Sequence, residues 1–387
     1  MEVGIDKIAF YTPKYYLDLV ELAQARDVDP NKFTIGIGQD QQAVIPNYED
    51  AVTMGVNAAN QILTDDNRQS IGQLYFGTES GVDNSKSAAI FAAKLLNLSP
   101  YIRAMEVKEA CYGGTFALMM ARDYVKLHPD QKVLVLAADV ARYGLDTPGE
   151  VTQGGGGIAM LVSAQPKLAV IEDESVFASR DVADFWRPVD RMAALVDGHL
   201  STEIYKEMFA DLWQRYQKQT QAEIGNFAAF AFHLPYTKMG KKALDEIIDQ
   251  ADEQQAERLL EALKASQAYA RRVGNLYTGS LYLSLLSLLQ QDAALQAGDR
   301  LALFSYGSGA EAELFTLKLQ KDFKQIIAQQ KVEEALDARQ RLSVAEYEAD
   351  FQKQLYDSSQ NVESDYPKDS QDAVFTGWRD GQRIYRA

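Results

Sequence analysis

The stretch "YIRAMEVKEACYGGTFALMM", residues 101–120, contains the only cysteine in a chain of 387 residues. It begins as a β-prone run and, beyond two glycines, continues as an apolar helical pattern. Cys111 is therefore expected where a strand turns into a helix, and a helix N-terminus lowers the pKa of a thiol. Gly113 and Gly114 would let a substrate or another backbone come close. The position suits a reactive thiol, but taken alone it leaves the alternative favoured, because most free cysteines are small buried hydrophobic residues.

Short apolar runs alternate with longer helical patterns along the rest of the chain, which predicts an α/β architecture. Strands are expected at residues 7–12, 73–80, 101–107, 132–141, 157–163, 167–173, 227–235 and 300–307. Helices are expected at residues 48–63, 85–97, 115–127, 280–290 and, with one break, 241–271. A polar tail of helices is expected from Glu311 onward.

Two apolar strands that open into turns with small residues indicate a weak internal duplication. They are "KVLVLAADVARYG" at 132–144 and "DRLALFSYGSGAE" at 299–311. The composition changes near Pro166, which favours an N-terminal half at residues 1–166 and a C-terminal half at residues 167–387. No low-complexity linker separates the halves, so we expect them to pack as one body.

Composition argues against several classes of protein. Hydrophobic residues make up 47% and charged residues 24% of the chain, as in soluble globular proteins. The formal net charge of −16 opposes general binding to nucleic acid or anionic membranes, so an anionic ligand would need a local basic patch. A single cysteine cannot form an intramolecular disulfide and fits a reducing cytoplasm. We expect neither a signal peptide nor a membrane span, because the most apolar stretch, 279–289, is too short.

A histidine and a group of lysines mark the second half. His233 ends the apolar run "FAAFAFHLP", and catalytic groups collect at strand ends in α/β folds, although a hydrogen-bonded core histidine fits equally well. Lys238, Lys241 and Lys242 fall in or just before the first turn of a predicted helix. Cations there oppose the helix macrodipole unless an anion binds nearby. The group therefore predicts a phosphate site, with a solvated basic face as the alternative.

Glu79 lies in "LYFGTESGVDN", in a Gly/Ser/Thr-rich turn after a predicted strand. A carboxylate there becomes a base if burial raises its pKa; otherwise it is a turn carboxylate or a helix cap. The glycines within 154–157 and 307–309 mark loops where backbone can run close to a ligand, but their spacing is not a dinucleotide-binding fingerprint. One cysteine and three scattered histidines do not form a zinc-binding pattern, so no metal is expected.

Several of these stretches together resemble the 3-hydroxy-3-methylglutaryl-coenzyme A synthase family, most closely its compact bacterial members. The resemblance covers essentially the whole chain and follows the order of the family's motifs. The motifs are "MEVKEACYGGT", "AADVARYG", "DFWRP", "FHLPYTKMGKKAL", "VGNLYTGSLYLSL" and "FSYGSG". The resemblance implies a thiolase-like α/β fold, with two similar halves and mixed five-stranded sheets in an αβαβα arrangement, in a homodimer.

The resemblance also implies a role for each matching residue. The nucleophile falls on Cys111, the general acid/base on Glu79, and the histidine that polarises the second substrate on His233. Residues that contact coenzyme A or form and support the acyl pocket fall on Asp29, Asp139, Tyr143, Thr152, Asp184, Ser201, Lys238, Lys242, Asn275 and Ser308. The loop after Tyr143, "GLDTPGEV", lacks an asparagine that animal members have.

The reaction implied by the resemblance is the condensation of acetyl-CoA with acetoacetyl-CoA through an acetyl-cysteine. This is an acyltransferase step of the mevalonate pathway that requires no metal or redox cofactor. A ketoacyl synthase-type enzyme is the alternative, with Cys111, His233 and Asn275 as its Cys-His-Asn set. Such an enzyme decarboxylates a malonyl thioester and needs no carboxylate base, so Glu79 separates the two. An inactive CoA-binding scaffold is a third possibility, and it would not become acetylated.

Overall fold

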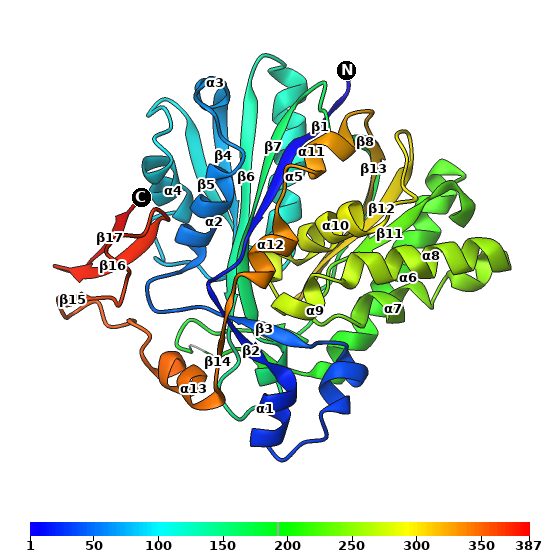
Figure 1. Cartoon of the computed structure of the whole chain (residues 1–387). Helices are drawn as coiled ribbons and strands as arrows, with labels where there is room; N and C mark the ends of the chain where they lie inside the picture. Colours follow the sequence, from blue (N-terminus) through cyan, green and yellow to red (C-terminus); the bar gives the residue numbers. More distant parts are fainter. Residues whose placement is uncertain (192) are drawn as a thin grey trace.

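The centre of the molecule is a mixed β-sheet to which both halves of the chain contribute (Figure 1). The computed structural model describes residues 1–191 and 193–387. Its sheet strands are β1 (Val3–Tyr11), β4 (Ile71–Gly77), β5 (Arg103–Val107), β6 (Lys132–Ala141), β7 (Gly154–Ala164), β8 (Ala169–Ser179), β11 (Ala229–Phe232), β12 (Arg300–Gly307) and β13 (Glu311–Leu319). They lie in the order β11-β12-β13-β8-β1-β7-β6-β4-β5.

The two halves repeat one pattern of strand directions. In the N-terminal half, β7 is antiparallel to β1 and β6, and β4 is parallel to β6 and β5. In the C-terminal half, β13 is antiparallel to β8 and β12, and β11 is parallel to β12. β12 therefore occupies the position of β6, which confirms the expected duplication. Only the N-terminal half has the expected five strands, because the described C-terminal strands include no counterpart of β5.

The halves join where β1 lies beside β8. Gly4 and Ile5 pair with Val170 and Ala169. A Cβ atom on Gly4 would lie 2.1 Å from the carbonyl oxygen of Ala169, so this close approach requires glycine. The sheets of the two halves are therefore continuous at this seam.

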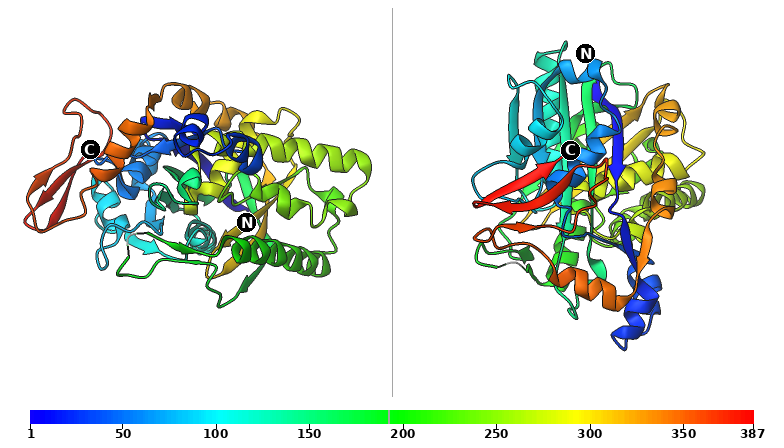
Figure 2. Two further views of the ribbon diagram at one scale, coloured as in Figure 1. Left: turned by 90° about the horizontal axis from the view of Figure 1, so that it is seen from below. Right: turned by 60° about the vertical axis from the view of Figure 1, so that its left-hand side comes forward.

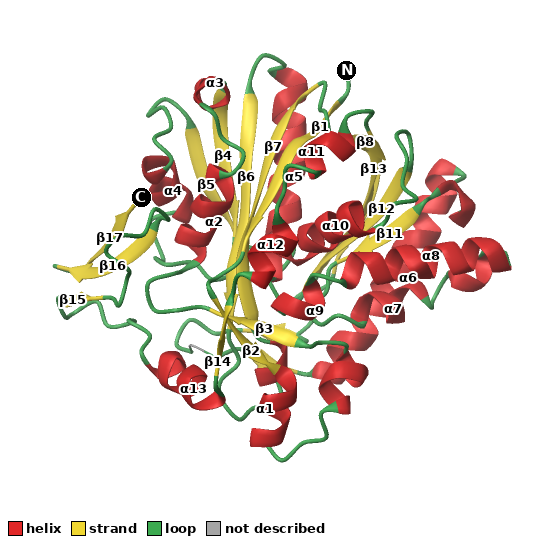
Figure 3. Ribbon diagram, viewed as in Figure 1, coloured by secondary structure: helices red, strands yellow, loops and turns green. Residues whose placement is uncertain are grey.

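Helices cover both faces of the sheet (Figure 3). They are α1 (Leu19–Ala25), α2 (Ala51–Asn60), α3 (Asp65–Gln69), α4 (Ala88–Leu95), α5 (Gly113–Leu127), α6 (Gly198–Thr220), α7 (Met239–Leu244), α8 (Glu253–Gln267), α9 (Ala270–Val273), α10 (Ser280–Gln291), α11 (Phe323–Ile327), α12 (Val332–Asp337) and α13 (Val344–Gln352). Shorter 3-10 or π turns are η1 (Lys32–Ile37), η2 (Glu150–Thr152), η3 (Ile224–Asn226), η4 (Ile248–Gln250) and η5 (Tyr277–Gly279).

Alternating side chains on the strands divide the core into layers. On β6, Val133 and Val135 pack with α5 and α10 in the middle of the molecule, whereas Leu134 and Leu136 pack with α2 and α4 on the outside. In the other half, α6 and α7 form an aromatic-rich outer cluster against β11, β12 and β13. The result is the αβαβα layering expected from the resemblance.

Two expected elements differ in the structure. The segment from Glu311 onward begins as β13 and not as a helix, because it pairs with both β8 and β12. The acidic Glu313 is tolerated there because the hydroxyl of Tyr112 donates a hydrogen bond to it, at 2.7 Å. The expected helix at 241–271 is divided among α7, η4, α8 and α9, and Asp252 starts α8 as a new helix by capping its N-terminus.

Smaller sheets stand apart from the central one. One contains β2 (Tyr15–Asp18), β3 (Gln41–Val44) and β14 (Gln340–Leu342), another β15 (Val362–Glu363), β16 (Val374–Arg379) and β17 (Gln382–Arg386), and a short hairpin β9 (Phe185–Trp186) and β10 (Leu195–Val196). Figure 2 shows the C-terminal strands, in red, at the edge of the molecule, where Tyr385 packs against Phe91 of α4. None of the described helices is long and apolar enough to cross a membrane.

Candidate active site

Two strands and one helix of the N-terminal half meet at a single place. Glu79 follows β4, Asp139 lies near the end of β6, and Cys111 lies two residues before α5. Ala110 adopts a φ of +38°, a left-handed conformation that costs free energy in a residue with a side chain. Cys111 is 9% exposed and packs against Tyr277 of η5. Strained backbone of this kind clusters at functional sites, so this turn is the candidate active site.

Glycines bring the start of α5 close to neighbouring backbone. A Cβ atom on Gly114 would lie 2.7 Å from the carbonyl oxygen of Thr278, and one on Gly77 would lie 2.5 Å from the amide nitrogen of Gly114. Of the two uses expected for the glycines beside Cys111, the structure therefore shows the approach of other backbone segments. The cysteine turn is held between the end of β4 and η5.

The thiol of Cys111 donates a hydrogen bond to Oε1 of Glu79, which lies 3.3 Å from the sulfur. Burial raises the pKa of Cys111 well above its usual value, and the charge of Glu79 raises it further. The lowering expected from a helix N-terminus is therefore outweighed. The resting thiol is protonated, and Glu79 is the acceptor placed to take its proton.

Glu79 itself is shielded from water. Its side chain is 7% exposed, and burial, followed by the charge of Asp139, raises its pKa to about 8. Arg187, whose Nη2 lies 3.9 Å from Oε2, and the hydrogen bond from Cys111 oppose this rise. The carboxyl group therefore ionises close to the pH at which a general base is most effective. The alternatives considered from the sequence, a turn carboxylate or a helix cap, do not account for this burial beside the thiol of Cys111.

Asp139 supports the site from within the core. It is fully buried. One carboxylate oxygen accepts hydrogen bonds from the Thr78 hydroxyl, at 2.7 Å, and from the N–H groups of Glu79 and Ser80, both at 2.9 Å. The other accepts from the N–H of Thr278, at 3.0 Å, and from its hydroxyl, at 2.5 Å. Asp139 therefore fixes the turn of Glu79 to η5. The contact with the acyl pocket that the resemblance implied for Asp139 stays a prediction.

Three aromatic rings pack around the sulfur. The ring centroids of Tyr143, Phe185 and Tyr277 lie between 6.0 and 6.2 Å from one another. The buried Asn275 donates from Nδ2 to the Tyr143 hydroxyl, at 3.4 Å, and its Oδ1 accepts from the N–H of Tyr277, at 2.8 Å. The structure thus brings the predicted residues Tyr143 and Asn275 together beside Cys111.

His233 lies directly beyond β11, as expected, and is buried. Its main-chain N–H donates to the main-chain carbonyl of Phe304, at 2.9 Å, and its main-chain carbonyl accepts from the Tyr205 hydroxyl, at 2.6 Å. Among the described residues, the ring nitrogen Nδ1 has no hydrogen-bond partner. Burial lowers the pKa of His233 to about 3, so its imidazole is neutral at neutral pH. In a core histidine with a purely structural role, both ring nitrogens would have hydrogen-bond partners. A buried nitrogen without a partner fits an imidazole that binds a ligand.

The loop after β12 lies against the cysteine turn. A Cβ atom on Gly307 would lie 2.7 Å from the Cβ atom of Tyr112, the neighbour of Cys111. Ser308 follows in this loop and so lies near the site. The buried carboxylate of Asp184 accepts a hydrogen bond from the N–H of Gly309, at 2.9 Å. Asp184 therefore supports the loop of Ser308. Its support of the acyl pocket stays a prediction.

The lysines of α7 are solvent-exposed, and the helix is only six residues long. Lys241 and Lys242 therefore lie in its last turn, where cations suit the macrodipole, and the conflict inferred from the sequence is absent. Lys241 is paired with Asp245 of the same segment, at 2.6 Å. The Nζ of Lys242 lies instead 5.4 Å from the ring centre of Tyr236. Of these two cations, Lys242 is better placed to meet a ligand.

Lys238 and the segment of Asp29 lie side by side although they are far apart in the chain. The N–H of Lys238 donates to the carbonyl of Ile37, at 3.1 Å, at the end of η1. Asp29 is exposed and lies just before η1. Two residues predicted to contact coenzyme A are thus carried by adjoining segments.

Two predicted residues are not drawn into the cluster around the sulfur. Thr152 lies in η2, and its hydroxyl donates to the carbonyl of Gly149, at 2.9 Å. Ser201 lies in the first turn of α6. Within the described part of the chain, no recorded hydrogen bond links either residue to Cys111 or Glu79.

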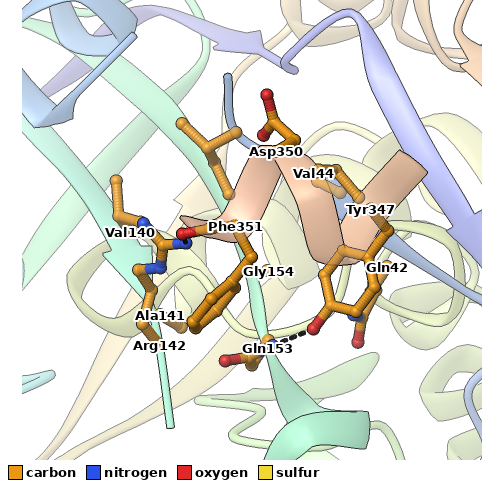
Figure 4. A pocket seen from close by; sticks show the side chains of 12 residues that line it. Gln42, Val44, Val140, Ala141, Arg142, Gln153, Gly154, Tyr347, Asp350 and Phe351 are labelled. Carbon is orange, nitrogen blue, oxygen red and sulfur yellow. Dashed lines mark hydrogen bonds between the residues drawn. The ribbon is translucent and has the colours of Figure 1, made fainter. Parts of the chain in front are cut away.

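The loop of Tyr143 has a support that was not singled out in the sequence. The Oε1 of Gln153 accepts from the N–H of Tyr143, at 2.8 Å, and its Nε2 donates to the hydroxyl of Tyr347 in α13, at 2.7 Å (Figure 4). The Tyr347 hydroxyl in turn donates to Glu150, at 3.2 Å. Figure 4 shows the small pocket behind the loop, lined by Gln42, Ala43, Val44, Ile45, Val140, Ala141, Arg142, Gln153, Gly154, Tyr347, Asp350 and Phe351. The only sequence signal was a glutamine next to the glycines that form the start of β7.

Known proteins are similar to this sequence over nearly its full length. Residues 1–167 match the family described as hydroxymethylglutaryl-coenzyme A synthase N terminal, and residues 254–378 match its C-terminal counterpart. The hydroxymethylglutaryl-CoA synthase of Enterococcus faecalis is 49% identical over 355 residues, which are 92% of this chain and 93% of that protein. The polyketide biosynthesis 3-hydroxy-3-methylglutaryl-ACP synthase PksG of Bacillus subtilis is 30% identical over 91% of this chain and 88% of that protein.

Solved structures agree with the sequence matches. A structure of HMG-CoA synthase complexed with CoA superposes with a TM-score of 0.95 at 42% identity, over 100% of this chain and 99% of that chain. MvaS in complex with 3-hydroxy-3-methylglutaryl coenzyme A superposes with a TM-score of 0.92 at 34% identity, again over 100% and 99%. The fold is therefore the thiolase-like fold of these enzymes. By sequence and by structure, the chain belongs to the hydroxymethylglutaryl-CoA synthase family.

Proposed function

We propose that the chain condenses acetyl-CoA with acetoacetyl-CoA and water to give 3-hydroxy-3-methylglutaryl-CoA and free CoA, a step of the mevalonate pathway. The observation that carries this proposal is the hydrogen bond from the Cys111 thiol to Glu79, 3.3 Å long, in a site shielded from water. It places a nucleophile and a base at one point. Relatives whose structures hold CoA and 3-hydroxy-3-methylglutaryl-CoA support the choice of substrates.

The first step moves the acetyl group to the enzyme. The sulfur of Cys111 attacks the thioester carbonyl of acetyl-CoA, and the bond to the CoA sulfur breaks. The thiol proton leaves through Glu79, its hydrogen-bond partner, and reaches the departing CoA thiolate. The products are an acetyl thioester on Cys111 and free CoA. A protonated resting thiol requires such an acceptor, because the thiolate is the nucleophile.

The second step forms the carbon–carbon bond. Glu79 removes a proton from the methyl group of the acetyl thioester, and the resulting enolate attacks the ketone carbon of acetoacetyl-CoA. Donors near the thioester oxygen must stabilise the enolate while it exists. The neutral imidazole of His233 and the amide of Asn275 are the groups that we assign to the ketone. The proton that Glu79 removes from the methyl group ends on the ketone oxygen, which becomes the tertiary alcohol.

The third step releases the product. Water attacks the thioester on Cys111, the carbon–sulfur bond breaks, and the thiol is restored. The product keeps its second thioester to CoA, which we propose is held on the surface of Lys238, Lys242 and Asp29. No electron is transferred in any of the three steps, and the polarising groups are side chains. We therefore propose that the reaction needs no redox cofactor and no metal.

We propose that two copies of the chain assemble through the edge of the sheet. β5 is the last strand in the sheet order, so one of its sides lacks a paired strand among the described residues. Met105 on this strand is 58% exposed, and Tyr101 just before it is 95% exposed. An unpaired edge with apolar side chains is suited to a second copy. Sedimentation equilibrium should give twice the chain mass, and a monomer at micromolar concentration would contradict this part of the proposal.

We also propose that the protein works in the cytoplasm, because its free thiol suits a reducing compartment.

Mass spectrometry of the intact protein tests the central claim. After incubation with acetyl-CoA, the wild-type chain should gain one acetyl group, and Cys111→Ala should gain none. Turnover of the variant should fall on the order of 10⁶-fold, as when other enzymes lose their nucleophile. Cys111→Ala removes only one small group from the core, so its circular dichroism should match the wild type. An unlabelled wild-type protein would identify an inactive scaffold.

A further inference from the structure

One arginine from outside the central sheet reaches the carboxylate that the proposed reaction uses as its base. Arg187 directly follows β9. Its guanidinium donates a hydrogen bond to the main-chain carbonyl of Glu79, and its Nη2 lies 3.9 Å from the side-chain Oε2 of the same residue. The side chain of Arg187 is 24% exposed, compared with 7% for Glu79. The cation thus contacts a shielded carboxylate from a position closer to solvent.

The hairpin that carries Arg187 is anchored on both sides. The carbonyl of Asp184 accepts from the N–H of Asp197, at 2.8 Å, and this bond closes the hairpin. The carboxylate of Asp184 accepts from the N–H of Gly309, at 2.9 Å. Phe185 packs into the aromatic group beside Cys111. Since its neighbours in sequence are fixed, Arg187 is held in place by the fold and not only by its own salt bridge.

Arg187 differs in the sign of its charge from the other charged groups around Glu79. Asp139 and Glu109 are anionic and raise the pKa of Glu79, after burial, which has the largest effect. The thiol of Cys111 donates a hydrogen bond and lowers it. Arg187 is the cation among the groups that act on Glu79 in the described part of the chain. Without Arg187, the hydrogen bond from Cys111 would be left as the influence among these groups that lowers the pKa of Glu79.

We propose that Arg187 is a positioning residue for the condensation, which clamps the turn of Glu79 through its main-chain carbonyl and places a positive charge beside its carboxylate. This inference rests on the proposed role of Glu79 as the base. Arg187 does not touch the reacting atoms in this proposal. It acts on the reaction through the carboxylate that does.

The pH profile of kcat/KM measures this effect, because its acidic limb reports the ionisation of the essential base in the free enzyme. A cation within about 4–6 Å lowers the pKa of a carboxylate by one unit or more. In Arg187→Gln, the limb should therefore move to higher pH by about one unit, with a rate about tenfold lower at pH 7 and recovery above pH 9. Arg187→Lys keeps a positive charge and should move the limb less.

Arg191→Gln is the matched control, because it removes the same charge from an exposed arginine of the same hairpin. Its acidic limb should stay at the wild-type position. Arg187→Met retains the apolar stem and repeats the test if the glutamine variant folds poorly, as judged by its Tm. An unmoved limb in both Arg187→Gln and Arg187→Met would overturn the inference, whether or not the rate falls. A lower rate without a shift would mean that Arg187 is only a structural clamp.

Glu79→Gln, measured in parallel, separates this inference from the proposed function. If Glu79→Gln condenses its substrates at the wild-type rate, the assignment of the base is wrong. If Glu79→Gln is inactive and the limb of Arg187→Gln is unmoved, the base stands and the role of Arg187 falls.

Discussion

The two halves of the molecule have the same pattern of strand directions, but one half carries an acidic side chain and the other a basic side chain at equivalent positions. Glu79 follows β4 in the N-terminal half, and His233 follows β11, the counterpart of β4, in the C-terminal half. Burial acts on both residues and favours the neutral form of each. It raises the pKa of Glu79 to about 8 and lowers the pKa of His233 to about 3.

This difference shows how a duplicated scaffold divides a reaction. The N-terminal half holds the thiol and the carboxyl group, which exchange protons and form covalent bonds in the proposed mechanism. The C-terminal half holds His233 and Asn275, which are neutral and polar. One physical cause, the removal of water, therefore prepares a base that can ionise near neutral pH and an imidazole that carries no charge there.

Of the changes that test this comparison, loss of the Glu79 carboxylate should have the largest effect on the rate of condensation. In Glu79→Ala, condensation should slow by about 10³-fold, the usual contribution of a general base. Acetylation of Cys111 should persist, although more slowly because the thiol loses its acceptor. Steady-state turnover and intact mass measure the two steps separately. Glu257→Ala removes an exposed carboxylate of α8, outside the site, and should turn over normally. Unimpaired condensation by Glu79→Ala would favour the ketoacyl synthase alternative.

Replacement of the His233 imidazole should have a smaller effect on kcat/KM and should not move the acidic limb of its pH profile. His233→Asn should lower kcat/KM by about 10²-fold through loss of the group assigned to the ketone. Because Glu79 is active only when ionised, kcat/KM should rise about tenfold per pH unit up to about pH 8 and then level off. The same limb should appear in His233→Asn, since His233 is already neutral across this range. A wild-type limb near pH 6.5 that disappears in the variant would show instead that His233 titrates.

A charge reversal on α7 should affect binding more than chemistry. Lys242→Glu should raise the KM for both CoA thioesters about tenfold, with little change in kcat. Lys241→Glu is its control, because Lys241 is already paired with Asp245, at 2.6 Å. Equal KM values for Lys242→Glu and the wild type would show that the CoA phosphates bind elsewhere.

The smallest effect is expected at the support of the Tyr143 loop. Tyr347→Phe removes the hydroxyl that joins Gln153 to Glu150, so the free energy of unfolding should fall by about 1–2 kcal/mol and kcat by a few-fold. Thermal unfolding and steady-state kinetics measure the two effects. Tyr356→Phe, at an exposed tyrosine, should change the free energy of unfolding by less than about 0.5 kcal/mol. Unchanged unfolding of Tyr347→Phe would mean that α13 does not hold the loop.

Most of the fold could be predicted because its strands follow simple hydrophobic patterns. β6 and β12 are apolar runs that end in small residues, and both appear where expected. β13 was missed because its burial depends on pairing with β8 and β12, and its acidic Glu313 accepts a hydrogen bond from Tyr112, more than 200 positions earlier in the chain. The breaks between α7 and α9 depend on local capping by Asp252, which a pattern of period 3.6 does not reveal.

The chemical groups of the site could be named from the sequence, but their ionisation could not. Position at a helix start predicts a lowered pKa for Cys111, whereas burial and the charge of Glu79, which follows another strand, raise the pKa. Arg187 stood within a recognised motif, yet its contact with Glu79 exists only because a hairpin folds back over β4. Asp139 and Gln153 likewise bind main-chain groups that become neighbours only in the folded chain.

The position of α13 has a consequence for biosynthesis. Tyr347 holds a loop that was translated almost two hundred codons earlier, and among the described residues no nearer one accepts the hydrogen bond from the side chain of Gln153. A nascent chain on the ribosome therefore cannot form this support of the Tyr143 loop while residues beyond 340 are still in the exit tunnel.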